Sequence, residues 1–214
     1  MDRANGRSHT TRRRLLEAGL EVFARDGFRG ATIERICRKA GANIAAAHYH
    51  FGDKRRLYAA VFADAERRAL ASGPAEAPED GAPEARLRAH VAFFLHRLLD
   101  PNRPAWMAQL LAHELLDPTP ALDRIVRRRM RANHEQISTA IRELAPGARP
   151  DAVRLATLSV IAQCVFYRHS AAIISRLYPD FDPAREVEHI ADHVTRFSIA
   201  GLASLRGRRG DSRP

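Results

Sequence analysis

Apolar residues recur at helical spacing through most of this 214-residue chain, and short breaks rich in proline and glycine separate the helical segments. From Thr10 to Asp26, for example, Leu15, Ala18, Val22 and Phe23 fall on one face of a helix. No stretch sustains the alternation of a half-buried strand. The pattern therefore predicts an all-α protein.

A pair of short helices joined by a tight turn is predicted soon after this first segment. Thr32 is a suitable N-cap for the first helix of the pair, whose inward face is apolar. Gly41 ends that helix, and Asn43 can cap a second one that covers about residues 44–50. We interpret residues 31–50 as a helix-turn-helix.

The second helix of this pair is too small and too polar on its outside to belong to a core. Ile44 and Ala47 are expected to face inward, which leaves small residues and polar rings on the outer face. Small side chains let the backbone approach a DNA groove, and alanine can touch a thymine methyl group. The hydroxyl, imidazole and ammonium groups nearby suit phosphates and base edges. The predicted DNA-contacting residues are Thr32, Asn43, Ala45, Ala46, His48, Tyr49, His50 and Lys54.

The charge of the chain supports DNA as a partner. The formal net charge is +10, and residues 1–60 carry +7 of it, from 13 basic and 6 acidic side chains. A local excess of this kind attracts phosphate in a salt-dependent way. A solvated basic face would have the same composition, so the charge alone does not decide between the two.

Breaks in the pattern divide the chain into domains. We expect a disordered basic arm over residues 1–8, a three-helix DNA-binding domain over 9–70, and a linker rich in proline, glycine and acidic residues over 71–84. A helical domain for ligand binding and dimerisation is expected over residues 85–205, followed by a disordered basic tail over 206–214. Its expected helices cover residues 85–100, 105–116, 120–144, 151–177 and 183–205.

The last two of these helices indicate a homodimer. The helix over 151–177 is apolar nearly all round, so it is expected to be buried on more than one side, and a second copy of the chain can supply the second side. The following helix carries one apolar face. Two such helices from each subunit would form a four-helix interface. The predicted interface residues are Leu158, Ile161, Val165, Ile190, Val194 and Phe197.

The compartment expected is the cytoplasm, with association to the nucleoid when the protein is bound to DNA. Apolar runs are too short to span a membrane, the arginine-rich start lacks an apolar signal region, and the two cysteines suit small buried residues in a reducing environment. No phosphate-binding loop, nucleophile elbow or supported acid pair is present, so we expect neither an enzyme nor a cofactor.

The residues from about Arg12 to Leu57 resemble the TetR family of bacterial repressors. The matching positions are Leu15, Ala18, Val22, Phe23, Gly27-Phe28, Thr32, Ile36, Ala40-Gly41, His50-Phe51, Lys54 and Leu57. Cys37 replaces the usual alanine, Asn43 the usual serine and Ala47-His48 the usual Leu-Tyr, so Tyr49 is the expected substitute for the phosphate-binding tyrosine. The run from Gly41 to Lys54 and the segment from Ala112 to Asp123 resemble the CecR-like branch of the family.

This resemblance implies a homodimer whose two heads bind the half-sites of a near-palindromic operator in double-stranded DNA. It also implies a repressor that a small-molecule effector releases by binding the C-terminal helices. The predicted ligand-lining residues are Trp106, Met107, His113, Glu114, His134, Phe166, Tyr167 and His169.

Two other functions stay open from the sequence. His189 and His193 lie four residues apart on one helix, which suits a metal-responsive regulator, although no third ligand is evident. A dimer that binds DNA without sequence preference would have the same charge and the same salt dependence.

Overall fold

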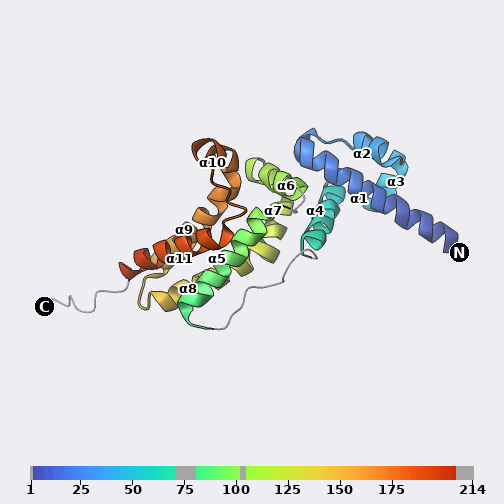
Figure 1. The fold of residues 1–214 in the computed structure, drawn as a ribbon. Helices are drawn as coiled ribbons and strands as arrows, with labels where there is room; N and C mark the ends of the chain where they lie inside the picture. Colours follow the sequence, from blue (N-terminus) through green and yellow to red (C-terminus); the bar gives the residue numbers. More distant parts are fainter. Residues whose placement is uncertain (1, 71–80, 102–104, 206–214) are drawn as a thin grey trace. The chain divides into compact units, whose positions relative to one another are not determined.

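The computed structural model describes residues 2–70, 81–101 and 105–205, and every regular element in these ranges is a helix (Figure 1). The predicted all-α class is confirmed. In chain order the elements are α1 (Asp2–Gly30), α2 (Ile33–Ala40), α3 (Ile44–Phe51), α4 (Lys54–Leu70), α5 (Pro83–Leu99), α6 (Ala105–Leu116), α7 (Pro120–Ile125), the π-helical turn η1 (Val126–Met130), α8 (Arg131–Leu144), α9 (Pro150–His169), α10 (Ala171–Leu177) and α11 (Val187–Ala203).

The helices form two compact units, each with its own buried apolar cluster. The first unit contains α1–α4, α6 and α7, and the second contains α5 and α8–α11, with the division inside η1. Within residues 85–205, which we predicted as the C-terminal domain, α6 packs against α1, and α7 against α4. These two helices bury Met107, Leu110 and Ile125 in the cluster of the first unit, which is why they belong to it.

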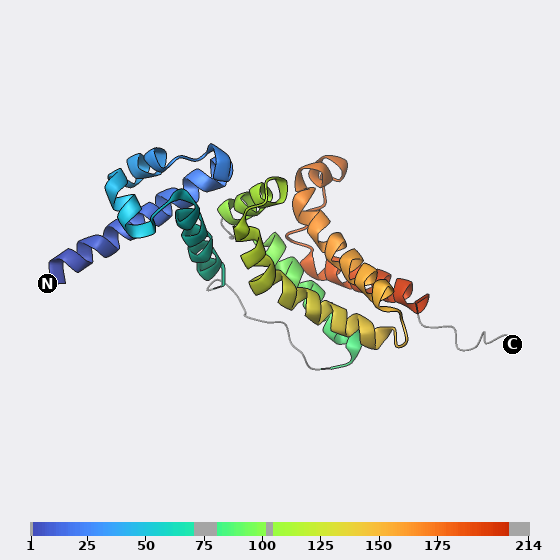
Figure 2. The ribbon, with the colours of Figure 1, turned by 180° about the vertical axis from the view of Figure 1, so that it is seen from behind.

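In the first unit, α1 contacts α2, α3, α4 and α6 (Figures 1 and 2). Tyr58 on α4 lies at the centre of an aromatic group, with its ring centroid 4.7 Å from that of Phe23 and 5.1 Å from those of Phe28 and Phe62. Offset and edge-to-face ring pairs of this kind add to the free energy gained by burial. The core under the helix-turn-helix is therefore built by α1 and α4.

In the second unit, α5 packs against α8, α9 and α11. On α9 the buried residues are Val153, Thr157, Val160 and Cys164, which form a single stripe at helical spacing. Several other apolar residues of the predicted helix 151–177 stay exposed. Within one subunit α9 buries this one stripe, and the predicted burial of a second side stays a prediction.

Three local predictions are corrected by the structure. The N-terminal arm is helical from Asp2, as a continuation of α1. The helix predicted over 151–177 is interrupted at Ser170, where α9 and α10 meet at a bend of 74°. The last helix begins at Val187, since Asp182 and Pro183 form a separate turn in which the Asp182 carboxylate accepts a hydrogen bond from Ala184 N.

Residues 71–80 of the predicted linker and the predicted tail over 206–214 lie outside the described residues. No single helix in the described part of the chain is long and apolar enough to span a membrane; the bent pair α9–α10 reaches the required length and composition when the two are joined.

Candidate nucleic-acid interface

The helix-turn-helix forms through the caps that the sequence predicts. Thr32 Oγ1 accepts a hydrogen bond from Arg35 N at 3.2 Å, at the start of α2. Gly41 ends α2 with a φ of 58°, a left-handed conformation that glycine adopts without steric cost. Asn43 Oδ1 then accepts from Ala46 N at 2.7 Å, at the start of α3. These bonds stabilise the tight turn, and the Asn43 amide keeps its donor hydrogens for another partner.

Helix α3 packs on the core of the first unit through its inner face, and its other residues are exposed or half-buried. Ala47 and Phe51 are buried beneath it. Ala45, His48 and Tyr49 are exposed, and Tyr49 is 83% exposed, a high value for an aromatic side chain. Ala46 and His50 are half-buried. An outer face of small residues and polar rings is what contact with a groove requires.

Ile44 does not face the core as we predicted, because 43% of its surface is exposed. It is the first residue of α3, and side chains on a helix point back toward the N-terminus. Its side chain therefore extends past the edge of the core.

The two histidines of α3 have different environments. His48 Nδ1 lies 2.5 Å from the Gly52 carbonyl oxygen. Since a carbonyl oxygen can only accept, Nδ1 carries the hydrogen and Nε2 is left for another partner. Burial lowers the pKa of His50, and the positive charges of Arg12 and His9 lower it further. His50 therefore takes up a proton at a lower pH than an ordinary histidine does.

Lys54 has a role within the protein that the sequence did not indicate. Its ammonium group donates to the Arg29 carbonyl oxygen at 3.3 Å and lies 4.7 Å from the ring centroid of Phe28. Burial lowers the pKa of Lys54, and the charge of Glu34 opposes this shift. Lys54 thus binds the end of α1, and its predicted contact with DNA would use the same ammonium group.

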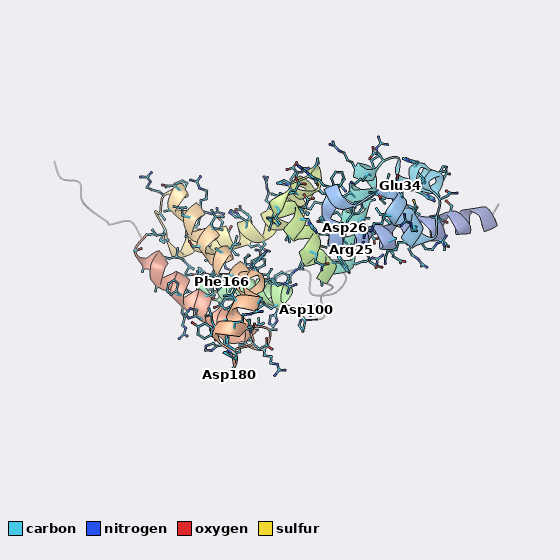
Figure 3. All side chains as sticks on the ribbon, turned by 90° about the horizontal axis from the view of Figure 1, so that it is seen from above. Arg25, Asp26, Glu34, Asp100, Phe166 and Asp180 are labelled. Carbon is cyan, nitrogen blue, oxygen red and sulfur yellow. The ribbon has the colours of Figure 1, made fainter. Side chains whose placement is uncertain are left out.

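Other basic residues near α2 are held by carboxylates of the first unit. Lys39 pairs with Glu21 at 2.6 Å, and Arg35 pairs with Asp26 at 3.0 Å. Arg25 and Asp26 lie next to each other at the end of α1, and Glu34 lies on α2 (Figure 3). Arg38, exposed on α2, has no ion pair within the ranges that the structure describes, so its charge is available to a phosphate.

Helix α6 is bound to the DNA-binding helices by two residues that we predicted as ligand contacts. His113 Nε2 lies 3.0 Å from the Ala24 carbonyl oxygen on α1. Glu114 is fully buried; its Oε1 accepts from Tyr58 Oη at 2.7 Å and from Thr119 Oγ1 at 2.7 Å, and its Oε2 accepts from Thr119 N at 2.9 Å. A buried carboxylate needs such partners, and here the chain itself supplies them.

Tyr58 is the residue of this group that sequence reasoning missed. It is 2% exposed, and burial together with the hydrogen bond to Glu114 raises its pKa. The available signal was a tyrosine among the inward residues of α4, because a buried tyrosine hydroxyl usually has a partner.

The remaining predicted ligand residues do not form one site. Met107 is 8% exposed and lies with Trp106 at the core of the first unit. In the second unit Tyr167 packs on the core, whereas Phe166 is 55% exposed and points outward on α9 (Figure 3). The half-buried His134 and the exposed His169 also belong to the second unit.

The predicted dimer residues divide into two groups. Ile190 and Val194 are at most 2% exposed and belong to the core of their own subunit, so they have no surface to offer a partner. This corrects the prediction for α11, whose apolar face is used internally. Leu158 and Phe197 are 50% and 65% exposed. Ile161 and Val165 are half-buried.

Family models match nearly the whole described chain. The model for bacterial regulatory proteins of the tetR family matches residues 15–61, which contain α2, α3 and most of the core beneath them. The model for the C-terminal domain of the HTH-type transcriptional dual regulator CecR matches residues 83–202, more than half of the chain. The protein belongs to the CecR-like branch of the TetR family. It is accordingly a DNA-binding transcriptional regulator, and the predicted family, helix-turn-helix and absence of enzyme function are confirmed by these matches.

Individual relatives support the same conclusion. The regulator is 43% identical over 53 residues to the HTH-type transcriptional regulator SrpR of Pseudomonas putida, covering 25% of each chain. It is 32% identical over 71 residues to UidR of Escherichia coli K12, covering 33% of this chain and 36% of UidR. The matched part therefore spans a quarter to about a third of these relatives.

A solved structure of a candidate transcriptional regulator from Pseudomonas aeruginosa PAO1 has the same fold along most of both chains. It superposes with a TM-score of 0.62 at 25% identity, and the match covers 91% of this chain and 93% of that one.

Proposed function

We propose that this regulator is a repressor that binds a near-palindromic operator as a homodimer and leaves it when a small molecule binds. The observation that carries the proposal is the outer face of α3. Ala45 and Tyr49 are exposed on a helix of eight residues whose inner face is anchored by Ala47 and Phe51. Small residues permit close approach to base edges, and the tyrosine hydroxyl and the imidazole groups suit phosphates.

The homodimer is supported by apolar side chains that remain exposed in the second unit. The large ones on α9, α10 and α11 are Leu155, Leu158, Phe166, Ile173, Leu177 and Phe197. A second copy packed on α9 and α11 would cover the exposed side chains of these two helices as a four-helix interface. A dimer would present two α3 helices to half-sites about 34 Å apart.

The dimer is tested with Phe197→Arg. We expect this substitution to convert a dimer into a monomer, as measured by light scattering coupled to size-exclusion chromatography, because it buries an unpaired charge in the interface. Leu116→Arg is the matched control, since Leu116 is 86% exposed and lies in the first unit. A wild-type monomer, or a dimer that Phe197→Arg leaves intact, contradicts the proposed interface.

Sequence-specific binding is tested by fluorescence anisotropy with DNA from upstream of the regulator's own gene and with scrambled DNA, at two salt concentrations. A preference of about 10³ or more supports a specific operator. Ala45→Phe and Ala46→Phe should remove the preference, whereas Ala132→Phe, at an exposed position on α8, should keep it. Equal, salt-sensitive binding of every DNA in a genome-wide selection would instead indicate a non-specific DNA-binding dimer.

Lys54→Ala should weaken binding to all DNA and lower the salt slope by about one, as expected for the loss of one phosphate contact. Since Lys54 also binds Arg29, the stability of the variant has to be measured alongside.

A metal-responsive function has no supporting observation in the structure. His189 and His193 are both exposed, and no group of three or more potential ligands is present in the described part of the chain.

A further inference from the structure

A cavity of about 290 Å³ lies inside the first unit, between the end of α1, the side of α4 and the turn from α6 to α7. Part of its wall is aromatic. Phe28, Tyr58 and Phe62 line it, and the rings of Phe28 and Phe62 each lie 5.1 Å from the ring of Tyr58. Tyr58 and Phe62 are each 2% exposed, so the half-buried Phe28 presents most of the ring surface on which a flat apolar group can stack.

The charged residues around the cavity give it a positive excess. Arg29, Arg55 and Arg124 line it, and Asp117 is the carboxylate among the lining residues. Arg29 neutralises Asp117 through contacts of 2.6 Å and 2.7 Å. Arg55 and Arg124 have no ion pair or hydrogen bond from their side chains within the residues that the structure describes. Two guanidinium groups are therefore left beside an aromatic wall.

We propose that this cavity binds a small organic anion with a flat apolar body, namely an aromatic carboxylate of one or two rings. Guanidinium groups bind carboxylates through two parallel hydrogen bonds, and Arg55 and Arg124 supply them from two different helices. The half-buried ring of Phe28 receives the apolar body. The volume lies at the lower end of the range for ligand pockets, which limits the ligand to a small molecule.

The position of the cavity allows a bound ligand to change how the DNA-binding helices are arranged. Arg55 belongs to the first turn of α4, which follows α3 after Gly52 and Asp53, and Arg124 belongs to α7. A carboxylate bound by both arginines favours the arrangement of α4 and α7 that brings the two guanidinium groups together. If that arrangement differs from the one that fits the operator, the ligand lowers the affinity for DNA. This step deepens the proposed ligand-released function and rests on it.

Binding is tested by isothermal titration calorimetry with 2-naphthoate and with the neutral 2-naphthamide on the full-length protein. We expect naphthoate to bind at least about tenfold more tightly, because a charge-assisted hydrogen bond contributes on that order. Arg55→Gln and Arg124→Gln should each remove most of this difference while the amide binds as before. Arg67→Gln is the matched control, since Arg67 lies on α4, pairs with Asp64 and does not line the cavity. Equal affinity for acid and amide, no binding of naphthoate, or no effect of Arg124→Gln overturns the site.

The regulatory step is tested separately by operator anisotropy with and without saturating 2-naphthoate. If 2-naphthoate releases the wild-type protein from the operator but does not release the Arg124→Gln variant, the result supports the cavity as an effector site. Binding of naphthoate in the calorimeter without any change in operator affinity overturns that role. If the protein shows no operator preference even without ligand, the proposed function fails, and the calorimetry still decides whether the cavity binds the anion.

Discussion

The buried Glu114 carboxylate allows a direct test of how α6 is bound to the DNA-binding helices. Replacement by alanine removes the acceptor of Tyr58 Oη, which is buried, and of the two donors of Thr119, which is half-buried. An unsatisfied buried donor costs about 1–3 kcal/mol, and Thr119 can regain part of its bonding from water. Relief of the desolvated charge offsets some of this loss. We expect Glu114→Ala to lower the free energy of unfolding by about 2–4 kcal/mol.

A double-mutant cycle isolates the hydrogen bond itself. Tyr58→Phe should cost about 1–2 kcal/mol, and the double variant should cost less than the sum of the single variants by about 1 kcal/mol or more. The assay is urea unfolding followed by far-ultraviolet circular dichroism at one fixed protein concentration, because a dimer's stability depends on concentration.

Glu135→Ala is the control for the loss of a glutamate, since Glu135 is exposed and pairs with Arg142, and it should change stability by less than about 1 kcal/mol. Additive effects of the two single substitutions, or a cost of Glu114→Ala no larger than that of Glu135→Ala, would refute the reasoning.

Three further predictions follow from particular residues. Gly27→Ala should lower the free energy of unfolding by about 3 kcal/mol or more, as measured by thermal unfolding. Gly27 has a φ of 69°, and a Cβ there would lie 2.9 Å from His113 Nδ1. In the control Gly147→Ala the added Cβ meets no atom within 4 Å, so this substitution should cost about 1–2 kcal/mol. Both cysteines are buried, and burial raises the pKa of Cys164 to about 12, so neither thiol should react with Ellman's reagent at pH 8 until urea unfolds the protein. Because the pKa of His50 is lowered in the folded state, the unfolded state binds protons more readily, and stability should fall as the pH decreases below about 6.5. His50→Gln should flatten this pH dependence in urea unfolding between pH 5 and 7, and an unchanged slope would contradict the shift.

Much of the helix-turn-helix was predictable because its determinants are close in sequence. The caps at Thr32 and Asn43 bond to amides three residues later, and Gly41 takes the left-handed conformation that ends α2. The buried Ala47 also followed from helical spacing. The exposure of Ile44 did not follow from helical spacing, since it depends on how far the core extends beneath the first turn of α3.

The roles of the polar residues in α6 were not predictable in the same way. His113 and Glu114 are titratable groups in an apolar helix, so the sequence predicts that they have partners, and a ligand is one candidate partner. The partners are Ala24 and Tyr58, which lie 89 and 56 residues away along the chain. Spacing within α6 carries no information about them.

By itself the sequence determined the helices, most of their ends and the family, because periodicity, caps and turn residues act over three or four positions. The tertiary structure decided which apolar faces are used within one subunit, as at Ile190 and Val194, and which stay exposed, as at Phe197. It also joined α6 and α7 to the DNA-binding helices and brought Arg55 and Arg124 to one cavity. These outcomes depend on burial against segments far apart in the chain, and local sequence does not specify which segments those are.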